Sequence, residues 1–196
     1  MTSDMDIKEA AKYINEGGVI CIPTETVYGL ACDASDERAI NHIYELKGRD
    51  EGKPMQIMVD SLEKAQEIGI FSEKATKVGQ KHWPGPLTIV VKRRDNAPIS
   101  PILSAGLDTV GIRVPDSEIM MNLLKETGKI LATTSANISG EPAATSYDEV
   151  IHQFGDKLSC VIDGGKSEIG IPSMVVDFVG ENIKILREGS IKKEDL

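Results

Sequence analysis

The order of apolar patterns along the chain is the sequence feature that most limits the folds it can adopt. Short apolar runs alternate with helical patterns through residue 154, and consecutive strand patterns then follow at residues 160–162, 174–179 and 183–186. Helices between every pair of strands would indicate a strictly parallel sheet, whereas successive strands indicate antiparallel pairs. The chain therefore predicts an α/β fold, α+β in character, with an open twisted mixed sheet flanked by helices.

The individual patterns are short and bounded by ordinary capping signals. Ser3 and Asp6 resemble a capping box for a first helix, which stops at Gly17, and Ser35 and Asp116 are predicted to cap later helices. Strands are also predicted at residues 19–22, 55–59, 87–92, 109–114 and 130–133, and helices after residue 35 and at 61–68, 72–82, 118–126 and 146–154.

Length and composition are those of one globular domain. The chain has 196 residues, 40% of them hydrophobic, which is enough to bury a core, so we predict a single domain over residues 1–196. No apolar run approaches the roughly 18 residues that a membrane helix needs. Residues 1–9 are acidic and polar, unlike a secretory signal. These patterns predict a cytoplasmic protein with no membrane segment.

The charge and the cysteines argue against two kinds of site. A net charge of -9 argues against an extended surface that coats nucleic acid, because such a surface needs cations to release phosphate counterions. A local basic pocket remains compatible with it. Cys21, Cys32 and Cys160 lack C-x-x-C spacing and have no close histidine. The sequence therefore predicts free thiols and no metal site.

Four polar clusters lie where apolar patterns end, which is where a packed scaffold presents chemistry. They occupy residues 23–30, 47–49, 111–115 and 135–140. The chain contains neither G-x-G-x-x-G nor G-x-x-x-x-G-K-[ST], so any phosphate must be held by side chains and isolated backbone amides. This requirement points to Lys47 and Arg49, and the four clusters together suggest an anion-binding site built from distant segments.

Each cluster also has an ordinary structural explanation. Thr24 could simply fill a turn. Lys47 and Arg49 lie at a helix exit, where the helix dipole favours cations, and spacing alone prefers that explanation. Arg113 is a sharper candidate because it shares a strand face with Gly111. If that face is enclosed, Arg113 needs an anionic partner, and a ligand carboxylate would serve.

The segment 135–140 follows an apolar strand, so its small donors lie at the strand's carboxyl end, the usual crevice side of α/β sheets. They suit close approach to a nucleotide, or they form a polar turn. A nucleophilic serine is not predicted, because none of His42, His82 and His152 lies in a motif that would pair with it.

Taken in order, the motifs resemble the YrdC-like family of threonylcarbamoyl-AMP synthases. They read P-T-E-T-V-Y-G-L at 23–30, K-x-R at 47–49, K-P at 53–54, W-P-G-P-L-T at 83–88, G-x-R-V-P at 111–115, S-A-N-x-S-G at 135–140 and P-S-x-V-V-D at 172–177. Each motif alone is weak, but the ordered set is specific and extends over about residues 6–190. The resemblance is to the single-domain form of the family.

This resemblance implies a twisted sheet around a large concave cavity. It implies a nucleotidyltransferase that converts L-threonine, bicarbonate and ATP, with Mg²⁺, into threonylcarbamoyl-AMP and pyrophosphate. The product then passes to a downstream tRNA-modifying complex. Threonine is then held by Thr24, Arg113 and Ser173, and ATP by Lys47, Arg49, Thr109, Thr133, Ser135, Asn137 and Arg187, with Lys47 and Arg49 catalytic.

Two other functions stay open. One is a non-catalytic module that binds double-stranded RNA or tRNA in translation or ribosome assembly. The acidic pI counts against it and leaves at most weak RNA binding. The other is a relative that forms a different carbamoyl adenylate, as in the carbamoyltransferases that mature hydrogenases. Those proteins carry acyl-phosphatase and zinc-finger segments, which this sequence does not contain.

Overall fold

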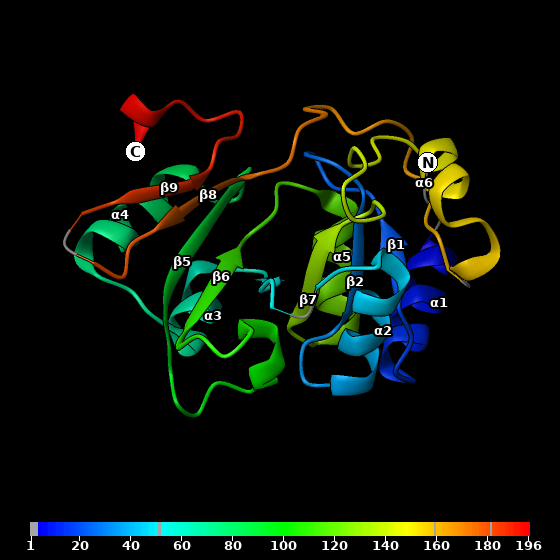
Figure 1. The fold of residues 1–196 in the computed structure, drawn as a ribbon, viewed down its shortest axis with the longest axis horizontal. Helices are drawn as coiled ribbons and strands as arrows, with labels where there is room; N and C mark the ends of the chain where they lie inside the picture. The colour runs from blue at the N-terminus through cyan, green and yellow to red at the C-terminus, as the bar shows by residue number, and fades with distance from the viewer. Residues whose placement is uncertain (1–3, 51, 159, 181) are drawn as a thin grey trace.

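A computed structural model describes residues 4–50, 52–158, 160–180 and 182–196 (Figure 1). Ser3 of the predicted capping box lies outside these residues. The helices are α1 (Asp4–Asn15), α2 (Glu37–Lys47), α3 (Leu62–Ile68), α4 (Glu73–His82), α5 (Glu118–Thr127) and α6 (Tyr147–Phe154). None of the helices in the described ranges has both the length and the apolar character needed to cross a membrane.

The described strands form one mixed sheet. They are β1 (Ile20–Ile22), β2 (Gly29–Asp33), β3 (Gln56–Met58), β4 (Gly69–Ile70), β5 (Leu87–Arg93), β6 (Thr109–Arg113), β7 (Leu131–Ser135), β8 (Met174–Asp177) and β9 (Lys184–Arg187). Their order is β1-β2-β7-β3-β6-β5-β8-β9, with β4 paired to β5. β3 and β6 are parallel, as are β5 and β8, and the other pairs are antiparallel. The predicted mixed sheet is confirmed.

Two apolar clusters cover the two faces of this sheet. On one face, Leu30, Ile57 and Ile89 belong to the cluster that includes apolar residues of α2, α3 and α4. On the other face, Ala31 and Leu131 pack with α1 and α5. Figure 1 shows these last two helices beside β1, β2 and β7, away from β5 and β8. At the other end of the sheet, no α-helix of the described residues covers the face that α1 and α5 cover here.

Several predicted boundaries were wrong. Two short strands were not predicted: β2, which begins inside the polar cluster at residues 23–30, and β4. The predicted strand at 160–162 contributes only a bridge between Cys21 and Val161 in the described chain.

The caps of two helices were each misplaced by one residue. Asp36 caps α2 by accepting from the first-turn amides, whereas the hydroxyl of Ser35 donates to Asp33 at 2.7 Å. Ser117 caps α5, because its hydroxyl accepts from the amide of Met120, whereas the backbone amide of Asp116 donates to Glu25.

Residues 163–173 connect the α6 side of the molecule to β8 without regular secondary structure (Figure 1). Their backbone is tied to the first polar cluster. The amides of Ile169 and Gly170 donate to the carbonyls of Glu25 and Thr26, each at 2.9 Å. Tyr28 donates its hydroxyl to the carbonyl of Gly165 at 2.7 Å. The 163–173 segment therefore fixes the first polar cluster at the open part of the sheet.

Candidate functional site: a cationic cavity on the open face of the sheet

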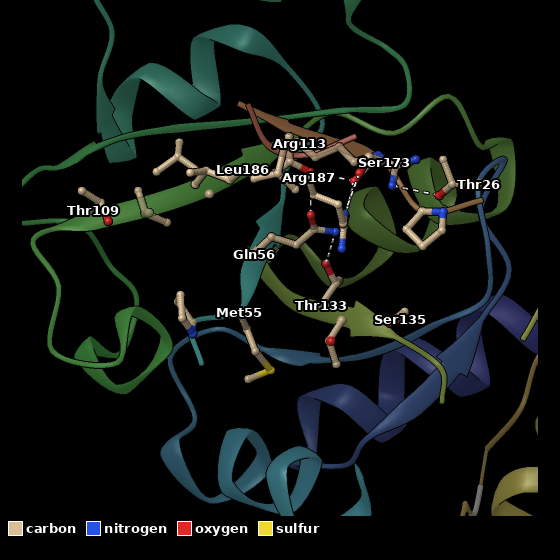
Figure 2. Close-up of a pocket in the computed structure, with 18 of the residues that line it drawn as sticks. Thr26, Met55, Gln56, Thr109, Arg113, Thr133, Ser135, Ser173, Leu186 and Arg187 are labelled. Atoms are coloured by element: carbon tan, nitrogen blue, oxygen red, sulfur yellow. Dashed lines mark hydrogen bonds between the residues drawn. The ribbon is translucent and has the colours of Figure 1, made fainter. Parts of the chain in front are cut away.

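A cavity of about 220 Å³ lies on this open face (Figure 2). Strand alternation explains its lining, because successive side chains point to opposite faces. Thr109, Gly111 and Arg113 of β6 line the cavity, whereas Ile112 belongs to the core behind the sheet. The complete lining is Thr26, Val27, Arg49, Pro54, Met55, Gln56, Thr88, Val90, Leu107, Thr109, Val110, Gly111, Arg113, Thr133, Thr134, Ser135, Pro172, Ser173, Val175, Leu186 and Arg187.

Three arginines give the cavity a positive charge, and its described lining contains no carboxylate. Burial lowers the pKa of Arg187, and repulsion from Arg113 and Arg49 lowers it further. Burial also lowers the pKa of Arg49, whose buried Nε has no hydrogen-bond partner among the described residues. Cations that repel one another in a half-enclosed space are stabilised by a bound anion, so the cavity is suited to an anionic ligand.

Arg113 is the most deeply buried of the three, with 2% of its surface exposed. Its Nη2 forms an ion pair with Oε1 of Glu25 at 2.6 Å. Its Nη1 donates to the hydroxyl of Thr26 at 3.0 Å, and its Nε donates to the carbonyl of Gly85 at 3.1 Å. The sequence predicts an anionic partner for a buried Arg113, and within the protein that partner is Glu25. The geometry leaves Arg113 held in one orientation beside the cavity.

A chain of hydrogen bonds crosses the floor of the cavity from β9 to β7 (Figure 2). Arg187 donates from Nη2 to the hydroxyl of Ser173 at 3.0 Å. The hydroxyls of Ser173 and Thr88 are 2.9 Å apart, and Thr88 donates to Oε1 of Gln56 at 2.6 Å. Gln56 then donates from Nε2 to the hydroxyl of Thr133 at 3.4 Å.

Lys47 lies behind the cavity wall and supports the segment 135–140. Only 1% of its surface is exposed, and its ammonium donates to the carbonyl of Ser135, to the carbonyl of Asn137 at 2.7 Å and to Oδ1 of Asn137 at 3.1 Å. Burial lowers the pKa of Lys47 to about 7, and repulsion from Arg49 contributes. All three donors of the ammonium are thus used within the protein.

The side-chain amide of Asn137, like the ammonium of Lys47, makes its hydrogen bonds within the protein. Its Nδ2 donates to the carbonyls of Ile138 and Glu141 at 3.0 and 2.8 Å. Its Oδ1 also accepts from the hydroxyl of Ser135 at 2.6 Å. The amide of Asn137 therefore builds the loop that presents Ser135 to the cavity.

The structure brings most of the predicted site residues together. Arg49, Thr109, Arg113, Thr133, Ser135, Ser173 and Arg187 all line the cavity. Thr24, Lys47 and Asn137 are not among the lining residues, so a direct ligand contact by them stays a prediction. Thr24 instead donates to the carbonyl of Val27 at 2.7 Å, and its hydroxyl is 2.9 Å from that of Thr26.

Sequence reasoning missed Glu25, Thr26, Gln56 and Thr88. The available signal was polarity at alternating positions, because Gln56 and Thr88 interrupt otherwise apolar strands. Glu25 and Thr26 were inside a recognised cluster, but only Thr24 of that cluster was assigned to a ligand.

No group of three His, Cys, Asp or Glu side chains in the described chain could hold a metal ion. The described cavity lining contains no carboxylate, the usual protein ligand of a hard divalent cation, and its guanidinium groups repel such a cation. The donor set therefore does not fit a metal ion held by the protein alone.

The fold and the site define a known family. A family model for Sua5, YciO and YrdC, described as "Telomere recombination", matches residues 12–189. The chain belongs to this family.

Two curated relatives and one crystal structure illustrate the similarity. The threonylcarbamoyl-AMP synthase of Pyrococcus abyssi is 39% identical over 97% of this chain, and that of Bacillus subtilis is 36% identical over 100%. The crystal structure of P. abyssi Sua5 complexed with L-threonine superposes with a TM-score of 0.94 at 38% identity over 98% of this chain. This chain spans 56% of the length of each of these three proteins.

Proposed function

We propose that this chain is a nucleotidyltransferase that forms threonylcarbamoyl-AMP and pyrophosphate from L-threonine, bicarbonate and ATP. The observation that carries the proposal is the cavity with three arginines and no carboxylate in its described lining, in a chain of this family. Both the substrates and the developing transition state of this reaction are anionic. Guanidinium groups and hydroxyls fixed beforehand around such charges are an effective source of catalysis.

The reaction joins two anions that repel each other in water. The amine of threonine and bicarbonate give a carbamate with loss of water, and a carbamate oxygen attacks the α-phosphorus of ATP as the bond to the pyrophosphate leaving group breaks. The barrier falls when cations hold both anions at bonding distance. The mixed anhydride hydrolyses easily, so a half-enclosed cavity also protects the product.

The proposed roles follow from the position of each residue. Arg49 and Arg187 hold the phosphates, and Thr109, Thr133 and Ser135 contact the nucleotide. Arg113 and Ser173 hold threonine together with Thr26. Besides the ligand contacts predicted for them, Thr24 supports Thr26, and Lys47 and Asn137 shape the segment 135–140.

An apolar wall suits the adenine ring, because a nucleobase buries its flat faces against aliphatic groups. This wall is formed by Val90, Leu107, Val175 and Leu186. Mg²⁺ is proposed to enter with ATP through the phosphates, since the lining lacks carboxylate ligands of its own.

The product is proposed to pass to a downstream tRNA-modifying complex in the cytoplasm. The free thiols of Cys21 and Cys32 fit a reducing compartment. We regard residues 1–196 as one domain, which is supported by the single sheet that carries the whole cavity.

The test is pyrophosphate release from ATP with threonine and bicarbonate supplied separately and together. We expect release only when both are present, because the attacking carbamate needs both. Equal release with either one alone would reject the assignment. RNA titrations with and without millimolar ATP provide the second arm. Tight RNA binding that ATP leaves unchanged, in a protein that releases no pyrophosphate, would favour the RNA-binding module instead.

A further inference from the structure

The hydrogen bonds across the cavity floor all run in one direction. A guanidinium can only donate, so the hydroxyl of Ser173 accepts from Arg187. The single hydrogen of the Thr88 hydroxyl goes to Oε1 of Gln56, so the hydroxyl of Ser173 is the donor to Thr88. The carbonyl oxygen of Gln56 thus accepts a hydrogen bond, and its amide nitrogen donates one to the hydroxyl of Thr133.

Gln56 reaches Thr88 across the strand between them. β3 and β5 both pair with β6, and Gly111 of β6 is opposite Gln56. A Cβ at position 111 would come within 3.2 Å of Cγ2 of Thr88 and 3.6 Å of Cβ of Gln56. The space above Gly111 therefore admits the bond between Gln56 and Thr88, and a larger residue would fill it.

The direction of the chain determines what Thr133 offers. Its hydroxyl oxygen accepts from Gln56, and no described residue accepts its hydrogen. Thr133 is 1% exposed and lines the cavity, so its rotation is restricted by its surroundings. The free hydrogen is thus available to a ligand in the cavity.

We propose that Gln56 is a positioning residue that fixes the Thr133 hydroxyl as a hydrogen-bond donor to the phosphate chain of the nucleotide. The proposal rests on the proposed function for the identity of the ligand. An amide at position 56 is needed because it has one accepting and one donating atom. A carboxylate of the same shape would accept from Thr88 and from Thr133, withdraw the free hydrogen and add a negative charge.

The experiment measures binding of tripolyphosphate by calorimetry, together with the KM values for ATP and threonine. We expect Gln56→Glu to weaken tripolyphosphate binding by about tenfold or more, because a carboxylate in a half-enclosed cavity repels the anion. Gln56→Met and Thr133→Val should each weaken it about threefold through loss of one hydrogen bond. The KM for ATP should rise in the same order. In Gln56→Met and Thr133→Val the KM for threonine should change less than about twofold, since neither variant adds a charge and Thr133 does not contact threonine in this assignment.

A double variant separates positioning from general damage. If Gln56 acts through Thr133, Gln56→Met should add almost nothing in the Thr133→Val background. Gln66→Glu is the matched control, because Nε2 of Gln66 also donates to a threonine hydroxyl, that of Thr76 at 3.4 Å, outside the cavity. It should bind tripolyphosphate as the wild type does.

Three results would overturn the proposal: unchanged tripolyphosphate binding in Gln56→Glu, additive losses in the double variant, or an equal loss in Gln66→Glu. The proposed function is judged separately. A wild type that binds tripolyphosphate in a Gln56-dependent way, yet releases no threonine-dependent pyrophosphate, would reject that function and keep the role of Gln56.

Discussion

The corner of the cavity around Arg113 and the wall that carries Arg49 and Arg187 are built from the same residue type but differ in charge balance. Arg113 has a carboxylate, Glu25, at 2.6 Å. Arg49 and Arg187 have no ion pair with a described residue, and their hydrogen bonds go to neutral oxygens such as the carbonyls of Pro54 and Ser173. The corner is neutralised by the protein, and the wall is left for the ligand to neutralise.

This difference in charge balance separates the effect of a substitution on stability from its effect on ligand binding. A buried ion pair is sensitive to loss of one partner, because the remaining charge is left without solvent. An uncompensated cation destabilises the free protein, and a bound anion removes that destabilisation. The corner should therefore respond to substitution mainly in stability, and the wall mainly in ligand affinity.

The largest effect is expected at the corner. Glu25→Gln keeps the shape of the side chain but leaves the buried Arg113 without a counter-charge, so the free energy of unfolding should fall by about 3–5 kcal/mol. Urea denaturation measures it. Glu67→Gln is the control, because it removes a carboxylate from the exposed pair with Lys64, at 2.7 Å, and should cost less than about 1 kcal/mol. Equal losses in the two variants would remove the distinction between corner and wall.

The next largest effect is expected at the wall. Arg187→Met keeps the aliphatic stem and removes a charge that Arg113 and Arg49 repel. Binding of ATP should weaken by about 1.5–3 kcal/mol, the value of hydrogen bonds to a charged group. Stability should change by less than about 1 kcal/mol, since relief of repulsion offsets the lost bonds to Ser173. Calorimetry with ATP and urea denaturation measure the two quantities, and the opposite pattern would make Arg187 structural.

The smallest effect, taken over one pH unit, concerns Lys47, which lies behind the cavity lining and contacts Ser135 and Asn137. Burial lowers its pKa to about 7 in the folded protein, compared with about 10.4 in an unfolded chain. Between these values the unfolded chain binds more protons, so this residue makes the free energy of unfolding rise with pH.

Denaturation of the wild type and of Lys47→Met from pH 6 to pH 10 measures this linkage. Above about pH 7 the free energy of unfolding of the wild type should rise relative to that of Lys47→Met, by up to about 1.4 kcal/mol per pH unit. If the free energies of unfolding of the two proteins change with pH in parallel, the pKa of Lys47 is the same in the folded and the unfolded protein.

Patterns within single strands made much of the fold and part of the site predictable. The alternation in residues 109–114 placed Gly111 and Arg113 on one face, and both line the cavity. The helix predicted at 146–154 was recognised from its local pattern, and Ser146 caps it by accepting from the amide of Glu149. Such features depend on neighbours in sequence, which the sequence presents directly.

Partners across strands were not predictable, because they depend on strand order. The bond from Thr88 to Gln56 requires β6 to lie between β3 and β5 and a glycine at position 111. Periodicity within a strand contains no information about that order. Likewise, Glu25 neutralises Arg113 only because the loop after β1 lies beside the end of β6, so the sequence could indicate that Arg113 needs an anion but not which one.

The 163–173 segment determines at which point of synthesis the cavity can be completed. The carbonyls of Glu25 and Thr26 and the hydroxyl of Tyr28 emerge from the ribosome well before their partners Ile169, Gly170 and Gly165; the separation from Tyr28 to Gly165 is 137 residues. Pairings between such distant residues form slowly, since a long loop must close first. A nascent chain that has not yet released this segment lacks Ser173 and Arg187 as well, so the lining of the cavity stays incomplete until residue 187 has been made.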